Sequence, residues 1–310
     1  MSTGVYEKTA GDLIRDALRA ATITGISLPV QPSDFAQGMM ALNDILASWQ
    51  TKQIHVWSNT EAFLPLNPNQ QQYSLGLTGE HCFTNYIYTT TTAAALSGAT
   101  TVEMNTAGMT AGQFIGIELS TGARQWATIS TVTDGTELVI STPLTAGVSE
   151  SASVYVYTTK IDQPVRILSI RYADGQTFDE IPTWQISRDE YYNQPSKTAT
   201  GATNSWYYWR DLSIGKLNIW PIADNCTRVL RFTFIKPQYI PEDQSEDILI
   251  PPEWYAPLKF KLAADLASGT YHIDPNVVVL LEQKAAQYLE DAMSTDNEFS
   301  SFSFYPEDRR

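Results

Sequence analysis

Helical periodicity is confined to the two ends of the chain, and this constrains the fold more than any other feature of the sequence. Thr9 has the residue type of an N-cap, with Asp12 three positions later, and Ser33 is a second candidate N-cap. Apolar residues recur at helical spacing after each cap. Residues 1–52 are therefore predicted to form a helical hairpin. The two apolar stripes are Leu13, Ile14, Ala17, Leu18 and Ala21, and Phe35, Met39, Leu42, Ile45, Leu46 and Trp49.

Two more helices are predicted within residues 251–293. Pro257 restricts where the first begins, because proline is tolerated only in the first turn, and Gly269 is its predicted stop. Asp274 and Pro275 suit the cap and the first position of the second helix. We expect the helices of both ends to pack into one bundle. The predicted buried face of the last helix is Val277, Leu280, Leu281, Ala285, Tyr288, Leu289 and Ala292.

Strand signals fill the chain between these ends. Residues 53–82 and 161–250 alternate β-formers with turn residues and are predicted to form one antiparallel β domain. Residues 83–160 differ in composition, because they are rich in Thr, Ser, Gly and Ala and almost free of Lys and Arg. Asp134-Gly135 is a strong hairpin signal within them. We expect an inserted all-β module of barrel or sandwich type with about five to seven strands, and an α+β fold overall.

Charge and composition exclude several classes of protein. The formal net charge is −14, which disfavours sequence-specific DNA binding because that depends on Lys and Arg. The two cysteines do not make a disulfide framework. We see no signal peptide and no apolar run long enough to span a membrane, so we expect synthesis in a cytoplasm.

The sequence contains no motif that predicts catalysis. His81 and Cys82 form at most a partial metal-ligand pair, whereas zinc needs four ligands, or three and a water. Residues 242–247 carry four carboxylates but lack the glycine and ligand spacing of a calcium loop, which favours a solvated acidic linker. Phosphate-loop, dinucleotide and nucleophile-elbow motifs are absent. We therefore predict no catalytic, cofactor or metal site and no enzymatic activity.

The stretch "SWYYWRD" places aromatic residues on both faces of a predicted strand: Trp206, Tyr207, Tyr208 and Trp209. One interpretation is a platform on which sugars or bases stack. The favoured alternative is a strand buried on one face and covered at a protein interface on the other, because stacking on nucleic acid also needs a basic groove. These four residues are candidate contacts with other subunits or tail proteins.

Several stretches in order resemble the head-to-tail adaptor proteins of short-tailed bacteriophages, also called tail accessory factors or head completion proteins. They are "TAGDLIRDALRAATITGI", "PSDFAQGMMALNDILASWQTKQIHVW", "EAFLPLNPNQQQYSLG", "PVRILSI", "WYYWRDLSIGKLNIWPI" and "DILIPPEWYAPLKFKLAADLA". Residues 83–160 have no counterpart in this resemblance.

The resemblance implies a virion protein at the head–tail junction. Such adaptors form a ring, usually of about twelve copies, beneath the portal; the ring extends the DNA channel, helps to retain packaged DNA and carries the tail nozzle. Their C-terminal segment commonly docks on the portal, which here would be residues 294–310, with Phe299, Phe302, Phe304 and Tyr305 as candidate anchors. The alternative function is binding of a host-surface glycan through residues 83–160.

Overall fold

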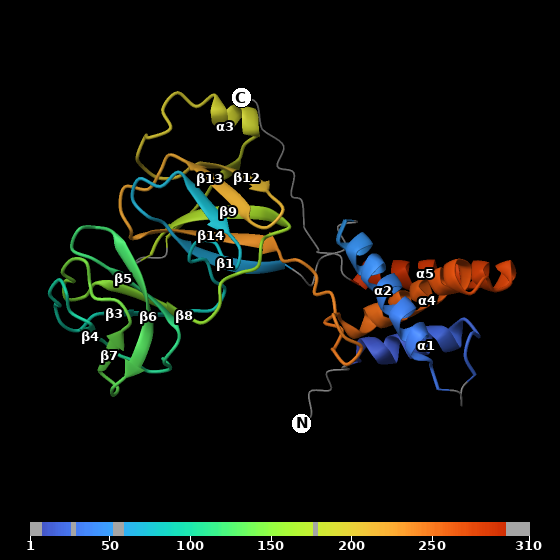
Figure 1. Ribbon diagram of the computed structural model, residues 1–310. Coiled ribbons are helices and arrows are strands. Elements are labelled where there is room, and N and C mark those ends of the chain that lie inside the picture. The colour runs from blue at the N-terminus through green and yellow to red at the C-terminus, as the bar shows by residue number, and fades with distance from the viewer. Residues whose placement is uncertain (1–7, 26–28, 52–58, 176–178, 296–310) are drawn as a thin grey trace. The chain divides into compact units, whose positions relative to one another are not determined.

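The computed structural model describes residues 8–25, 29–51, 59–175 and 179–295, and it confirms a mixed α+β protein with antiparallel sheets (Figure 1). The chain divides into two compact units. The helical unit combines the segment before residue 59 with the segment from Gln238 onward, and the strand unit is Asn59–Pro237. No helix in the described ranges has the length and hydrophobicity needed to cross a membrane.

The helical unit has one hydrophobic core, to which helices from both ends of the chain contribute. Thr9 caps the first helix by accepting a hydrogen bond from the Asp12 amide, as the sequence predicts. Trp49 and Trp254 meet edge to face in the core, with ring centroids 5.6 Å apart. The helices are α1 (Ala10–Ala20), α2 (Pro32–Thr51), α4 (Tyr255–Asp265) and α5 (Pro275–Thr295), and α4 is preceded by the 3₁₀ turn η2 (Pro252–Trp254).

Two details of these helices differ from the sequence-based expectation. The second helix begins at Pro32, one residue before its expected cap Ser33. Gly269 does not end the helix that contains it, because the chain continues through the π-helical turn η3 (Leu266–Thr270). The Tyr271 amide closes that turn on the Leu266 carbonyl, and His272, rather than a glycine, has a positive φ of 48°.

The segment 238–250 lies with the helices, whereas we expected it to end the β domain. Backbone hydrogen bonds tie it to the start of α1, since Ala10 donates to the Glu246 carbonyl and Gly11 to the Gln244 carbonyl. The Ile248 amide donates to the Lys8 carbonyl, and the Ile248 side chain is buried in the helical core. Polar composition predicted a linker, but these backbone contacts fix the segment on the helical unit.

Two four-stranded sheets enclose a second core in the strand unit. Their strand orders are β1-β14-β9-β10 and β11-β12-β13-β2, with all pairs antiparallel except β11 and β12. The first sheet comprises β1 (Asn59–Pro65), β9 (Arg166–Asp174), β10 (Glu180–Pro182) and β14 (Arg228–Ile235). The second comprises β2 (Gln72–Leu75), β11 (Trp184–Gln185), β12 (Ser205–Arg210) and β13 (Gly215–Trp220).

Residues 87–157 contain a six-stranded antiparallel sheet of order β3-β8-β5-β6-β7-β4 around a third core. A bridge between Thr91 and Met104, which follow the two outermost strands, brings the ends of the sheet together. Asp134 accepts a hydrogen bond from Thr136 in the predicted hairpin turn. The strands are β3 (Ile87–Thr90), β4 (Thr101–Glu103), β5 (Phe114–Glu118), β6 (Arg124–Val132), β7 (Glu137–Ile140) and β8 (Ser153–Tyr157).

An aromatic cluster joins this six-stranded sheet to the outer face of β1, β9 and β14. Phe63 of β1 packs against Tyr155 of β8, with ring centroids 5.2 Å apart, and the Tyr155 hydroxyl donates to the Gly175 carbonyl. Gly116 belongs to this packing, because a Cβ there would lie 2.4 Å from the Trp126 ring. One outer face of the sandwich is therefore partly covered from within the same unit.

Candidate functional site

The alternation of β12 sorts the four predicted contact aromatics onto two faces. Trp206 is only 1% exposed and lies in the core between the sheets. Tyr208 packs against the same core, and its hydroxyl donates to the Pro164 carbonyl at 2.6 Å. Trp206 is therefore not available to a partner, which corrects its assignment as a contact, whereas Tyr208 is half-buried and stays a predicted contact. Tyr207 and Trp209 lie half-buried on the outer face and remain predicted contacts.

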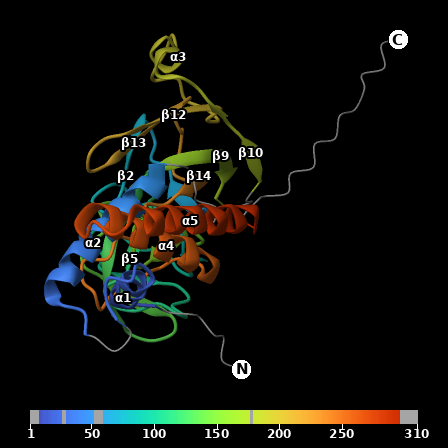
Figure 2. The ribbon, with the colours of Figure 1, turned by 90° about the vertical axis from the view of Figure 1, so that its right-hand side faces the viewer.

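A short helix covers part of this outer face. Helix α3 (Arg188–Tyr192) begins with a capping box, in which Ser187 accepts from the Glu190 amide and Glu190 accepts from the Ser187 amide. Figures 1 and 2 both show α3 beside β12 and β13, on the side away from β14. The buried Tyr191 ring lies 6.4 Å from the Tyr207 ring, which fixes α3 on the sheet.

Three cations lie over aromatic rings at this place. Arg188 of α3 lies 5.4 Å from the Trp209 ring centroid, and Lys216 of β13 lies 4.9 Å from the same centroid. Lys197 lies 4.5 Å from the Tyr191 centroid and also donates to the Tyr191 carbonyl. Such contacts contribute about 0.5–1 kcal/mol each at exposed sites. We call the set Arg188, Tyr191, Tyr192, Lys197, Trp209 and Lys216 the cationic face.

None of the three cations of this face forms an ion pair within the described parts of the chain. A cation on a ring contacts it through one side and keeps other N–H groups directed elsewhere. The arrangement can therefore accept an anionic group from outside. Sequence analysis missed Arg188, Lys197 and Lys216. The Ser187–Glu190 capping signal was visible, but nothing local showed which strand the helix would cover.

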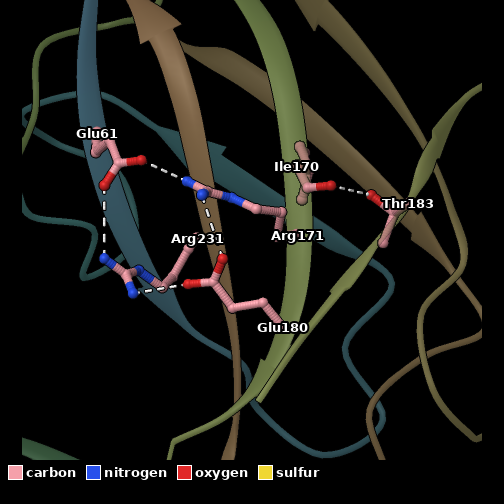
Figure 3. Close-up of polar contacts among 6 residues, drawn as sticks. All are labelled: Glu61, Ile170, Arg171, Glu180, Thr183 and Arg231. Atoms are coloured by element: carbon pink, nitrogen blue, oxygen red, sulfur yellow. Dashed lines mark hydrogen bonds and ion pairs between the residues drawn. The ribbon is translucent and has the colours of Figure 1, made fainter. Parts of the chain in front are cut away.

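The outer face of the other sheet carries paired charges (Figure 3). Arg171 contacts Glu61 at 2.5 Å and Glu180 at 3.2 Å, while Arg231 contacts Glu180 at 2.7 Å and Glu61 at 3.5 Å. Each arginine thus bridges both glutamates in a closed ring of four. The hydrogen bond and charge of Arg171 lower the pKa of Glu61, with a smaller contribution from Arg231. We call these four residues the charge ring.

His81 lies at the junction with the six-stranded sheet, among aromatic rings. Its ring stacks on Trp126, with centroids 4.0 Å apart, and its Nδ1 lies 2.5 Å from the Tyr157 hydroxyl. Burial, reinforced by the charge of Lys160, lowers the pKa of His81 to about 4. Cys82 is buried in the core of the sandwich. No cluster of three or more potential metal ligands occurs among the described residues.

The carboxylates of 242–247 make local hydrogen bonds. Glu246 accepts from the Glu242 amide and the Tyr239 hydroxyl, and Asp243 accepts from the amide and hydroxyl of Ser245. These bonds lower the pKa values of Glu246 and Asp243. We call residues 242–247 the acidic loop.

Helix α5 exposes more apolar surface than its sequence pattern predicts. Leu280 and Tyr288, expected on the buried face, are 51% and 41% exposed, and Val279 and Met293 are exposed as well. A hollow of about 420 Å³ lies toward the end of the helix, where Met293 is one of its lining residues. The residues lining it are Ala286, Leu289, Glu290, Met293 and Ser294.

The predicted anchors Phe299, Phe302, Phe304 and Tyr305 lie outside the described residues. Searches against protein-family models and curated proteins found no match to this chain.

Proposed function

We propose that this chain is a structural virion protein, a head-to-tail adaptor whose copies form a ring that joins the portal to the tail. By resemblance the ring has about twelve copies, extends the DNA channel, helps to retain the genome and contacts the tail nozzle. The helices of both ends would form its bundle and residues 83–160 its inserted module. The protein would be made in the host cytoplasm and function without catalysis.

The exposed apolar side chains of α5 are the observation that carries this proposal. Monomeric proteins rarely leave a contiguous set of large apolar side chains in water, and such patches mark contacts with other proteins. Val279, Leu280, Tyr288 and Met293 are exposed along this one long helix, and Met293 also lines the hollow. This surface suits a neighbouring subunit or the portal.

The net charge of −14 also fits a DNA channel. Acidic surfaces repel phosphates, so DNA passing through a ring of such chains would not be held by it during ejection.

Light scattering of the purified protein mixed with portal tests the proposal. We expect a complex heavier than the portal alone, and we expect Leu280→Asp to weaken it. Gln287→Asp is the matched control, because Gln287 is an exposed polar residue of the same helix. A wild-type protein that never joins the portal would refute the proposal.

One observation favours glycan binding as the second candidate. A hollow of about 320 Å³ on the six-stranded sheet is lined by polar groups that can hydrogen-bond to sugar hydroxyls. Binding of the full chain to a glycan array, lost in Glu150→Ala, would support this function, and a silent array would remove it. The lining residues include Glu118, Ser120, Ser149, Glu150 and Ser151.

A further inference from the structure

The three cations of the cationic face are unusual in a chain with this charge. The sequence has 34 acidic and 20 basic side chains, so carboxylates are in excess. Arg188, Lys197 and Lys216 nevertheless lie on aromatic rings rather than against carboxylates. Of the carboxylates nearest in sequence, Glu190 is occupied by its capping bond to Ser187, and Asp189 and Asp211 form no ion pair among the described residues. The three cations therefore keep fixed positions without a carboxylate partner in the described parts of their own chain.

The rings hold the cations in place. Trp209 has both Arg188 and Lys216 near its ring, so the ring itself is already in contact with two charged groups. This disfavours the use of Trp209 as a bare platform for a sugar or a base. The cations still have N–H groups that are free to donate hydrogen bonds, and carboxylates are good acceptors for them.

The acidic loop has the complementary properties. Glu242, Asp243 and Asp247 are exposed, and they form no ion pair within the described residues. The local bonds of Glu246 and Ser245 and the backbone contacts to α1 give the loop a defined conformation on the helical unit. Its carboxylates are therefore presented together.

We propose that the cationic face of one copy binds the acidic loop of a second copy of this chain. Charge complementarity selects this occupant, since the loop supplies the carboxylates that the face lacks. DNA is disfavoured because the chain is strongly acidic as a whole. The inference deepens the proposed ring and rests on it.

Such a contact is heterologous, because it joins two different patches. Repetition of a heterologous contact gives a closed ring when the rotation closes and a filament when it does not. Each copy would offer one face and one loop, so the same contact recurs around a ring of any number of copies.

Charge reversal in sedimentation experiments at low salt tests this contact. The face variant carries Arg188→Glu and Lys216→Glu, and the loop variant carries Glu242→Lys and Asp243→Lys. We expect wild-type association to weaken by about tenfold or more in each variant and to weaken with added salt, because exposed charges are screened. A Lys216→Ala variant checks the face with a smaller change, and unchanged thermal unfolding shows that the variants fold.

Mixing distinguishes a head-to-tail contact from any other. The face variant keeps a native loop and the loop variant keeps a native face, so an equal mixture should regain the association that each variant alone has lost. A chain carrying all four reversals should associate again. Failure of that chain to associate, or a wild-type protein that stays monomeric at every concentration, would overturn the inference.

A portal experiment separates this inference from the proposed function. If the face and loop variants join the portal as well as wild type does, the adaptor proposal stands and the contact between copies is wrong. If wild type does not join the portal, the adaptor proposal fails whatever the charge variants do. Binding of an oligonucleotide that is lost in the face variant would also overturn the choice of occupant.

Discussion

The two outer faces of the sandwich use their basic side chains in opposite ways. On β1, β9, β10 and β14, Arg171 and Arg231 are each paired with both Glu61 and Glu180. On β12, β13 and α3, the cations lie on rings and have no carboxylate partner among the described residues. On the first face the basic side chains are paired with carboxylates of the same chain, whereas on the second they can pair with the carboxylates of another molecule.

This difference has a physical consequence. An arginine that forks between two carboxylates has its donors used and its position fixed, so it adds little to a partner. A cation on an aromatic ring is held in place without being neutralised. Similar residue types thus produce a closed surface on one side of a single core and an open surface on the other.

Removing a core residue that lies between the two sheets should have the largest effect on stability. Trp206→Ala deletes a fully buried ring between the sheets and should lower the free energy of unfolding by about 3–5 kcal/mol. Trp206→Phe should cost much less, because it keeps most of the packing and removes a buried indole N–H for which the described residues offer no hydrogen-bond partner. Urea unfolding of both variants measures this, and equal losses would show that Trp206 is not a packing residue.

Lowering the pH should reduce the stability of the protein through His81, which lies at the junction with the six-stranded sheet. The pKa of His81 is lowered to about 4, so its contribution to stability is complete above pH 6.5 and is lost as the pH falls toward 4. Because the ring is only partly buried, we expect a loss of about 1–2 kcal/mol rather than the full value of the shift. Thermal unfolding across this range checks the prediction.

His81→Gln is the control for the acid prediction. It lacks the titrating ring, so it should unfold with a flatter dependence on pH between 6.5 and 4. An unchanged pH dependence would assign the acid sensitivity to carboxylates elsewhere in the chain.

The sequence predicted the features that depend on neighbouring residues. The cap at Thr9 and the hairpin at Asp134-Gly135 are local signals, and the structure has both. The charge ring was not predictable, because it joins residues from four strands whose register only the folded sheet defines.

The spacing of apolar residues also could not predict how exposed individual side chains would be. The apolar pattern of α5 predicts that one side of the helix is buried, but it does not predict how many neighbouring positions are covered. Leu280 and Tyr288 were therefore expected to be buried and are instead exposed. In β12 the alternation was visible, yet which aromatics faced the core depended on where the second sheet packed. The unpredicted positions are those whose neighbours come from distant parts of the chain.

Breaking the charge ring should reduce the free energy of unfolding by less than acid does. Glu180→Gln leaves Arg171 and Arg231 with Glu61 alone, and it should lower the unfolding free energy by about 1 kcal/mol because the pairs are partly exposed. The loss should shrink in high salt. Glu150→Gln is the matched control, because Glu150 is exposed and forms no ion pair with any described residue. An equal effect of both variants would contradict a special role for the ring.

The smallest effect on stability is expected on the open face. Lys216→Met keeps an unbranched side chain near Trp209 and removes only the charge, so we expect a change of about 0.5 kcal/mol or less. Salt should alter its stability no more than that of wild type, because no ion pair is lost. The measurement is urea unfolding at low and high salt, beside Glu180→Gln. If Lys216→Met proved as costly and as salt-sensitive as Glu180→Gln, the cation would be paired within its own chain, and the contrast between a closed and an open face would not hold. If it is neutral for stability, a loss of association in the same variant can be attributed to the missing contact between copies and not to unfolding.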